Sequence, residues 1–214
     1  MQQRTVHLAV YDTLADWEYG HAVAHLRNGM AHRASGPAFE IRTVGLGGAS
    51  GAVTTMGGLR VLPDLPLDAL APEESAMLIL PGAGLWDAGE ELAPFAKKAA
   101  EFVAAGVPVA AICGATAGLA REGLLDGRAH TSAAAEYLGF QSGYQGAADY
   151  RETEAVTSAD GLLVTAGPTE PVAFAREVLG RLDVMEPAVL DAWYRLFRHS
   201  DASAYPVLEA AAQR

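Results

Sequence analysis

Short apolar runs alternate along the chain with longer stretches in which apolar residues recur every three or four positions. The short runs are typical of buried strands, and the longer stretches are typical of amphipathic helices. We predict strands over residues 5–11, 39–44, 77–80 and 107–112 and helices over residues 14–30, 90–105 and 171–182. Strands that alternate with helices predict a mostly parallel sheet with helices on both faces.

The later part of the chain carries three further signals. The Asp160-Gly161 pair between residues 154–158 and 162–165 predicts an antiparallel hairpin at the edge of the sheet. Thr169 is the expected N-cap of the helix that begins at Pro171. Beyond residue 182, aromatic and apolar side chains at helical spacing predict an extension that packs on the domain. They are Trp193, Tyr194, Leu196 and Phe197.

We therefore divide the chain into a main domain over residues 1–182 and a helical extension over residues 183–214 packed on it. The glycine-rich segment 45–58 reads as a loop or a weak hairpin.

The charge balance narrows the range of partners. The 26 acidic and 15 basic side chains give a formal net charge of −11, and such a surface repels nucleic acid and anionic membranes. The N-terminal segment does not resemble a signal peptide, and no apolar stretch reaches the roughly 20 residues that span a bilayer. We expect a cytoplasmic protein with a small-molecule substrate and with neither nucleic acid nor membrane as a partner.

The single cysteine, Cys113, excludes an intramolecular disulfide and a multi-cysteine metal site, and we expect no metal and no cofactor. Cys113 follows a predicted buried strand, precedes a helix-compatible run, and has Ala111 and Ala115 two positions away on either side. Small residues on both sides of a nucleophile are typical of a sharp strand-to-helix elbow. There, amide groups and the helix dipole lower the pKa of a thiol. The alternative is a buried core cysteine without chemistry.

Acidic residues follow the first predicted strand. Asp16 and Glu18 begin the next helix at the carboxyl edge of the sheet, where open α/β sheets place their sites. Burial beside a thiolate would keep a Glu18 carboxyl neutral, so that it could donate a hydrogen bond to the sulfur. The alternative is a pair of surface carboxylates that stabilise the helix dipole.

A third candidate is the sequence LPGAG after the strand at 77–80. The amides of Gly82 and Ala83, with that of Gly114, could form an oxyanion hole, whereas the alternative is an ordinary tight turn. Trp17 and Trp86 neighbour these segments, either as walls of a site or as core residues.

These motifs, in this order, resemble the ThiJ/PfpI family, the family of the Parkinsonism-associated DJ protein, within the class I glutamine amidotransferase-like superfamily. The stretches that carry the resemblance are LPGAG, AICGATAGLA, GLLDGRAHTS and VTAGPTEPVAFAREVL, and it covers roughly residues 6–182. It implies an α/β fold: a flavodoxin-like three-layer sandwich with a mostly parallel sheet, an antiparallel edge hairpin and a C-terminal helical extension. It also implies that Cys113 is the reactive cysteine, Glu18 its acidic partner, and Ala83 and Gly114 the oxyanion positions.

The resemblance further implies a homodimer that buries the apolar surface of the first helix. The chain departs from the family at its histidines. Members with protease activity have a histidine directly after the cysteine, where this chain has Gly114, and other members have one where this chain has Ser132. His130, two residues earlier on a predicted strand, could substitute from the same face, but a locally bonded histidine is the alternative.

His21 and His25 are a weaker candidate. They lie four residues apart on the first helix, a spacing that suits a metal pair, but no third ligand is evident. His21 also lies one turn after Glu18, where it could reach the rim of the site.

Two functions follow from these residues. The first is an enzyme of the hydrolase or lyase type that acts on a small carbonyl or amide-like substrate through Cys113. A glyoxalase-like activity belongs to this class, whereas the missing histidine disfavours a peptidase. The second is a redox-responsive protein in which Cys113 is oxidised to a sulfenic or sulfinic acid, with little turnover. A regulatory use of the fold without turnover also remains open.

Overall fold

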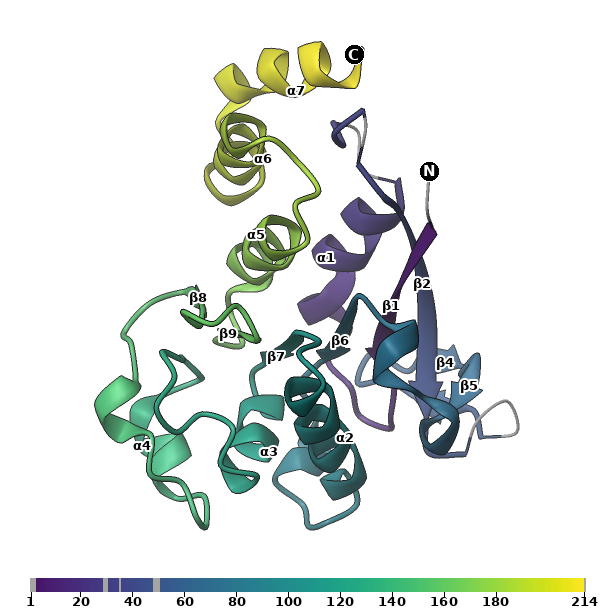
Figure 1. Ribbon diagram of the computed structural model, residues 1–214, viewed down its shortest axis with the longest axis vertical. Helices are drawn as coiled ribbons and strands as arrows, with labels where there is room; N and C mark the ends of the chain where they lie inside the picture. Colours follow the sequence, from purple (N-terminus) through teal and green to yellow (C-terminus); the bar gives the residue numbers. More distant parts are fainter. Residues whose placement is uncertain (1–2, 29–30, 35, 48–50, 214) are drawn as a thin grey trace.

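The strands expected from the short apolar runs lie side by side in the computed structural model, which describes residues 3–28, 31–34, 36–47 and 51–213. They form a seven-stranded sheet with the order β5-β2-β1-β6-β7-β9-β8 (Figure 1). The strands are β1 (Gln3–Ala9), β2 (Ala38–Gly45), β5 (Leu65–Pro66), β6 (Met77–Leu80), β7 (Val109–Ile112), β8 (Ala155–Thr157) and β9 (Leu163–Ala166). All neighbouring pairs are parallel except β8 and β9. The central order β2-β1-β6-β7-β9 is the flavodoxin-like order, so the predicted fold class is confirmed.

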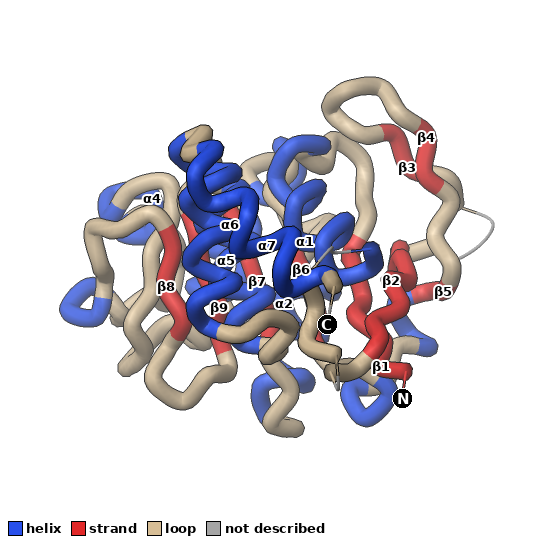
Figure 2. Tube along the Cα trace, turned by 90° about the horizontal axis from the view of Figure 1, so that it is seen from above, coloured by secondary structure: helices blue, strands red, loops and turns tan. Residues whose placement is uncertain are grey.

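Helices cover both faces of this sheet. Helices α1 (Asp16–Asn28) and α5 (Pro171–Arg181) pack together on one face, and α2 (Ala93–Ala104) and α3 (Ala115–Arg121) lie on the other (Figures 1 and 2). The short α4 (Ala135–Gly139) lies beyond α3. None of the helices in the described ranges is long and apolar enough to cross a bilayer.

The C-terminal residues form two further helices, α6 (Pro187–His199) and α7 (Tyr205–Ala212). Helix α6 packs on α5, and α7 packs on α6, so the two extend outward from the sandwich (Figure 1). The extension therefore packs on the sandwich, while the division of the chain at residue 182 stays a prediction.

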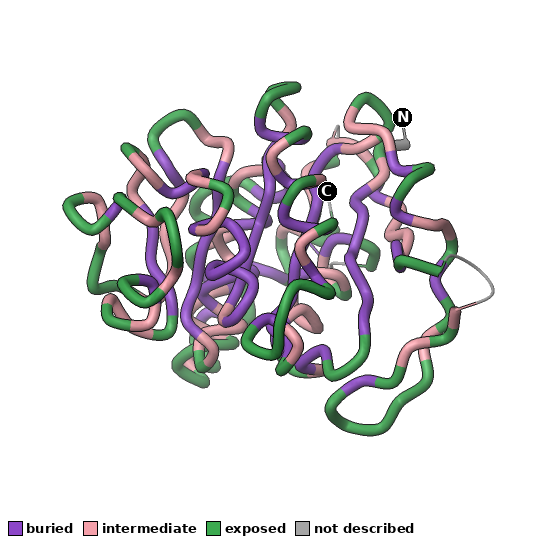
Figure 3. Tube along the Cα trace, turned by 90° about the horizontal axis from the view of Figure 1, so that it is seen from below, coloured by how far each residue is buried: buried purple, intermediate pink, exposed green. Residues whose placement is uncertain are grey.

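The core follows the central strands. Every residue of β6, β7 and β9 is buried, as expected for parallel strands covered on both faces. In Figure 3 the buried segments, in purple, run through the middle of the molecule, and the exposed segments, in green, lie around them. This burial fixes the three strands firmly, and their carboxyl ends form the edge at which the candidate residues lie.

The edge hairpin joins β8 to β9 around the predicted turn. Asp160 Oδ1 accepts hydrogen bonds from Ser158 Oγ at 2.5 Å and from the Leu162 amide at 3.1 Å. Gly161 has φ +70°, a left-handed conformation that glycine adopts without strain. The Asp160-Gly161 pair therefore forms the predicted turn, through the side chain of Asp160 and the left-handed backbone of Gly161.

Several predicted boundaries shift. The helix expected from residue 14 begins at Asp16 because Thr13 has φ +62° and Leu14 pairs with Ala83 instead, and its predicted last residues, 29–30, lie outside the described ranges. The strand expected from residue 107 begins at Val109, after a proline that lacks an N–H donor.

Two local predictions need correction or qualification. Thr169 is not the N-cap of α5: Glu170 takes that position, and the Thr169 hydroxyl donates to the Glu170 carboxylate at 3.0 Å. In the glycine-rich segment, β3 (Val53–Thr54) pairs antiparallel with β4 (Arg60–Val61), so a weak hairpin forms that reaches past residue 58. Residues 48–50 of that segment lie outside the described ranges.

Candidate active site

Cys113 lies at a sharp turn between β7 and α3. Its φ of +58° is unusual for a residue with a side chain and is a strained conformation of the kind found at nucleophile elbows. The fully buried Ala111 and Ala115 leave the crowded turn room to form. Its amide donates to the Ala166 carbonyl at 3.0 Å, and its carbonyl accepts from the Thr116 amide at 3.1 Å. The backbone around the thiol is therefore fixed on both sides.

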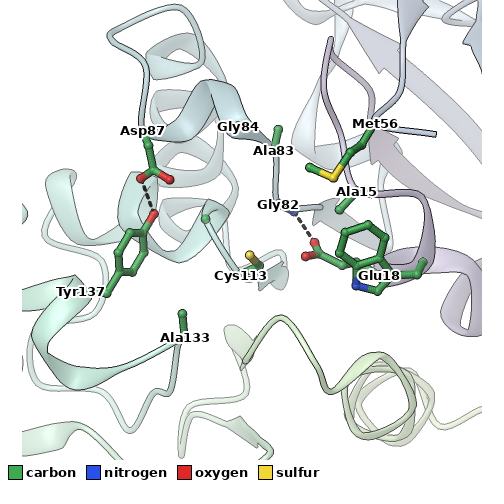
Figure 4. Close-up of a pocket in the computed structure, with 12 residues that line it drawn as sticks. Ala15, Glu18, Met56, Gly82, Ala83, Gly84, Asp87, Cys113, Ala133 and Tyr137 are labelled. Carbon is green, nitrogen blue, oxygen red and sulfur yellow. Dashed lines mark hydrogen bonds between the residues drawn. The ribbon is translucent and has the colours of Figure 1, made fainter. Parts of the chain in front are cut away.

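Glu18 faces this thiol from the first turn of α1. Its side chain is fully buried, and its Oε2 accepts a hydrogen bond of 2.5 Å from the Gly82 amide. The other oxygen, Oε1, is buried without a hydrogen-bond partner among the described residues. In Figure 4 the thiol and the carboxyl group point toward one another. Because Oε2 is already an acceptor, Oε1 is the oxygen available to hold a proton.

Burial dominates the electrostatics of the pair. It raises the pKa of Glu18 to about 7, as the sequence reasoning expected for a carboxyl enclosed near a thiol. Burial also raises the pKa of Cys113 to about 12, and the charge of ionised Glu18 adds to the rise. The expected lowering of the thiol pKa by the helix start is therefore wrong. The Gly114 amide, which does favour the thiolate, is outweighed.

Gly82 allows the two side chains to meet. A Cβ at this position would lie 2.7 Å from Cys113 Cβ, 2.8 Å from Glu18 Oε2 and 3.0 Å from Cys113 Sγ. Its amide is bonded to Glu18, so the expectation that it contributes to an oxyanion hole is corrected. Gly82 instead acts as a spacer and as the donor that orients the acid.

The amides of Ala83 and Gly114 remain as candidate oxyanion donors. Both residues line the cavity around Cys113, and within the described ranges neither amide donates to a backbone carbonyl. The Gly114 amide interacts with the thiol sulfur. Both residues thus lie beside Cys113, and their role as oxyanion donors stays a prediction.

The cavity above Cys113 has a volume of about 270 Å³. Its lining residues are Ala15, Trp17, Glu18, Met56, Gly82, Ala83, Gly84, Asp87, Cys113, Gly114, Ala133 and Tyr137. On the side opposite Glu18, the Tyr137 hydroxyl donates to Asp87 Oδ1 at 2.8 Å (Figure 4). Sequence reasoning missed this pair. Asp87 could have been found from its place just after the LPGAG turn, but nothing in the sequence marked Tyr137 on α4.

No histidine lies among the residues that line this cavity. His130 is not on a regular strand. One ring nitrogen bonds to the Arg128 carbonyl at 2.7 Å and the other to the Tyr144 hydroxyl at 2.7 Å. The locally bonded alternative therefore describes it, and both ring nitrogens are occupied away from the thiol.

Ser132 takes part in holding the elbow. Its hydroxyl shares a 2.6 Å hydrogen bond with Thr116 Oγ1, which also donates to the Cys113 carbonyl at 2.6 Å. Ser132 is buried and does not line the cavity, whereas its neighbour Ala133 does. The segment around Ser132 thus reaches the site, but the side chain that lines the cavity is the methyl group of Ala133, which is not a base.

His21 points away from the rim of the cavity. Its ring stacks on His25, with the two centroids 6.3 Å apart, and both rings pack edge-on against Trp193 and Phe197 of α6. Burial lowers the pKa of both histidines. No group of metal-binding side chains of three or more occurs in the described ranges, so this pair is a packing contact. That face of α1 is covered by α6, and a homodimer through α1 stays a prediction.

Asp16, Trp17 and Trp86 take different places around the cavity. Asp16 lies outside the cavity, where its Oδ2 accepts from the Gly57 amide at 2.6 Å. Trp17 is half-exposed and lines the cavity, with its Nε1 donating to the Pro168 carbonyl at 3.1 Å. Trp86 is buried, and its Nε1 donates to Tyr11 Oη at 3.2 Å and to the Pro81 carbonyl at 3.0 Å. Trp17 is thus a wall of the site, and Trp86 is a core residue beneath it.

The chain and its fold are similar to those of known proteins. The model of the DJ-1/PfpI family matches residues 4–181. The chain is 40% identical to the uncharacterized protease YoaZ of Bacillus subtilis over 92% of this chain and 91% of that protein. A thiJ/pfpI family protein from Bacillus anthracis has a similar structure, with 37% identity and a TM-score of 0.89 over 99% of this chain and 98% of the other. The DJ-1 superfamily protein Atu0886 from Agrobacterium tumefaciens is also similar, with 31% identity and a TM-score of 0.81 over 92% and 98%.

Proposed function

This chain belongs to the DJ-1/PfpI family, and from that membership we propose that it is an enzyme of the hydrolase or lyase type that uses Cys113 on a small carbonyl or amide-like substrate. The observation that carries the proposal is the Cys113 thiol at a left-handed elbow, on the floor of a cavity and opposite the buried Glu18 carboxyl. A core cysteine without chemistry needs neither the strained backbone nor a buried acid beside it.

The chemistry follows from the shared proton. Glu18 Oε1 accepts the thiol proton, which leaves a thiolate next to a neutral carboxylic acid. With Glu18 neutral, its charge no longer opposes ionisation of the sulfur. The thiolate forms a bond to the carbonyl carbon of the substrate, and the carbonyl electron pair moves to the oxygen. The Ala83 and Gly114 amides stabilise that oxyanion, and Glu18 then donates its proton to the same oxygen, which completes a neutral adduct on Cys113.

A peptidase activity is not proposed, although the Bacillus subtilis relatives carry the word protease in their names. Family members with protease activity resemble one another in a Cys-His pair, in which a histidine directly follows the cysteine and serves as acid and base. Gly114 stands at that position, and no histidine lines the cavity. A substrate with an activated carbonyl or a small leaving group suits this site better.

The test is a screen of glyoxals, isocyanides and small amides with the wild-type protein and the Cys113→Ser and Glu18→Gln variants. We expect turnover of at least one class that Cys113→Ser abolishes and Glu18→Gln lowers by about 100-fold, the lower end of typical acid–base contributions. Turnover that survives Cys113→Ser would overturn the proposal. Folding of each variant is checked by circular dichroism.

A redox-responsive role is the second candidate, and the cavity without histidine favours it. A neutral Glu18 can donate a hydrogen bond to an oxidised sulfur and so stabilise a sulfinic acid. Under mild peroxide, this role predicts that oxidation of Cys113 stops at one acid, which intact-protein mass spectrometry measures. Progress to the sulfonic acid would argue against it.

A further inference from the structure

The charged side chains that line the cavity are of one sign. Its lining residues include the acids Glu18 and Asp87 and no lysine, arginine or histidine. A neighbouring groove that shares Trp17 and Met56 with the cavity adds the carboxylate of Asp16 at the entrance. The chain as a whole carries a net charge of −11. The charged side chains that line the cavity would therefore repel an anionic substrate.

Two of these acids lie on opposite sides of Cys113 in the cavity (Figure 4). Glu18 is fully buried, and its Oε1 has no hydrogen-bond partner among the described residues. Asp87 is exposed, and its Oδ1 accepts from the Tyr137 hydroxyl. The second carboxylate oxygen, Oδ2, is not used in that hydrogen bond and can accept one from a substrate.

Asp87 is electrostatically close to the thiol. Its charge contributes to the raised pKa of Cys113, and the Cys113 charge in turn contributes to the raised pKa of Tyr137. Asp87 and Tyr137 line the same cavity as Cys113, so a substrate joined to Sγ shares that space with the pair. Met56 and Ala133 add only apolar surface, and the half-exposed Trp17 holds its indole N–H on the Pro168 carbonyl. Among the lining side chains, Asp87 is thus the charged group that a substrate meets after the Cys113–Glu18 pair.

From this arrangement we infer that the cavity selects substrates that carry a cationic or uncharged hydrogen-bond donor near the reacting carbon, and that Asp87 makes this selection. The inference rests on the proposed function because it specifies the substrate class of the same site. Tyr137 is the positioning residue, since its hydroxyl holds the Asp87 carboxylate in one orientation. Apolar walls on the remaining sides accept the rest of such a substrate.

The experiment uses charged thiol reagents, so it needs no turnover. Three methanethiosulfonates, with a trimethylammonium, a sulfonate or no charge, each convert the Cys113 thiolate into a mixed disulfide and release methanesulfinate. The measured quantity is the rate ratio of the cationic to the anionic reagent, divided by the same ratio for a free small thiol. The uncharged reagent reports any change in the thiol itself.

We expect a normalised ratio of about 10 or more for the wild type, because one nearby unit charge commonly changes a local interaction by that factor. Asp87→Asn should lower it about fivefold to tenfold, and Tyr137→Phe about twofold. Asp68→Asn removes an exposed charge that does not line the cavity and should leave the ratio unchanged. High salt should lower the wild-type ratio.

A wild-type ratio near 1 would overturn the inference, and so would an equal effect of Asp68→Asn and Asp87→Asn, which would assign the selectivity to net charge. If Asp87→Asn does not fold, the salt dependence and Tyr137→Phe still decide the question. An active screen with a ratio near 1 would reject the selectivity and keep the proposed function. A high ratio with no turnover in the screen would support the selectivity and reject the proposed function.

Discussion

The Gly82 amide donates to Glu18 Oε2 over 2.5 Å, so this amide of the turn after β6 binds the acid of the site and not a substrate oxygen. This bond leaves Oε1 as the oxygen that holds a proton beside Cys113. An amide donor favours the ionised carboxylate, yet burial outweighs it and raises the pKa of Glu18 to about 7. The acid is thus oriented by one interaction, and another raises its pKa so far that both protonation states are populated near pH 7.

The first prediction concerns the pH dependence of Cys113 alkylation. The Glu18–Cys113 pair should lose its first proton near pH 7. The rate with iodoacetamide should therefore rise up to about pH 7, flatten there because the ionised Glu18 opposes ionisation of the sulfur, and rise again at higher pH toward the thiol pKa. In Glu18→Gln the step near pH 7 should disappear, and the rate should rise about tenfold per pH unit up to the thiol pKa. Two identical profiles would show that the residues do not share a proton.

The second prediction concerns stability. The pKa of Glu18 is raised on folding, so its stabilising contribution is fully present below about pH 4.5 and is lost as the pH rises through 7. Relative to the wild type, Glu18→Gln should gain about 2 to 3 kcal/mol of unfolding free energy between pH 5 and pH 8, because 1 pKa unit corresponds to about 1.4 kcal/mol. Urea unfolding at both pH values measures this.

Subtracting the wild-type curve removes other titrating groups, which is the control that this measurement needs. Burial lowers the pKa of His7 to about 4, so its contribution has the opposite sign and is lost as the pH falls from 6.5. Cys113 titrates only at higher pH. A difference curve that is flat between pH 5 and pH 8 would contradict the raised Glu18 pKa.

The third prediction uses two glycines. Gly82→Ala places a Cβ within 3.0 Å of three atoms of Cys113 and Glu18 and should lower the unfolding free energy by about 1 to 3 kcal/mol. It should also slow Cys113 alkylation, because the pair must move apart. Gly20→Ala in α1 has no atom within 4 Å of the new Cβ and should stabilise the protein by about 0.5 to 1 kcal/mol. Chemical denaturation of both variants checks this, and equal effects would contradict the packing at Gly82.

The fold could be predicted from the sequence because its signals are local. The buried run at residues 77–80 matched β6 in full, and the Asp160-Gly161 pair predicted the edge hairpin. The positions of Cys113 and Glu18 followed from strand ends in a parallel sheet, which meet at the same edge. The N-cap of α5 failed because Thr169 lies one residue too early and bonds to the next side chain.

The site could be predicted only in part because it depends on contacts between distant segments. Gly82 was assigned an oxyanion role from its turn, but its amide bonds to a residue 64 positions earlier in the chain. Tyr137 meets Asp87 across 50 positions, and no local pattern marks that contact. The predicted direction of the Cys113 pKa shift was wrong. The sequence indicates that a helix begins after Cys113, but it does not show the burial of the thiol, which outweighs the effect of the helix start.

The last prediction concerns the position that directly follows the cysteine. A Cβ on Gly114 would lie 3.1 Å from Trp86 Cβ and 3.3 Å from Trp86 Cδ1. Trp86 is buried and held by hydrogen bonds to Tyr11 Oη and the Pro81 carbonyl, so it cannot yield without loss. Gly114 itself has φ −57°, a conformation open to any residue, so the cost of a side chain there comes from Trp86.

Gly114→His should therefore lower the unfolding free energy by about 1 to 3 kcal/mol and should not create peptidase activity on a casein substrate. Gly139→Ala, in α4 and with no atom within 4 Å of the new Cβ, is the control for a neutral glycine substitution. Thermal unfolding and a fluorescent casein assay measure both quantities. Because the histidine would need the space that Trp86 occupies, a stable Gly114→His variant that cleaves casein would show that Trp86 is not the barrier.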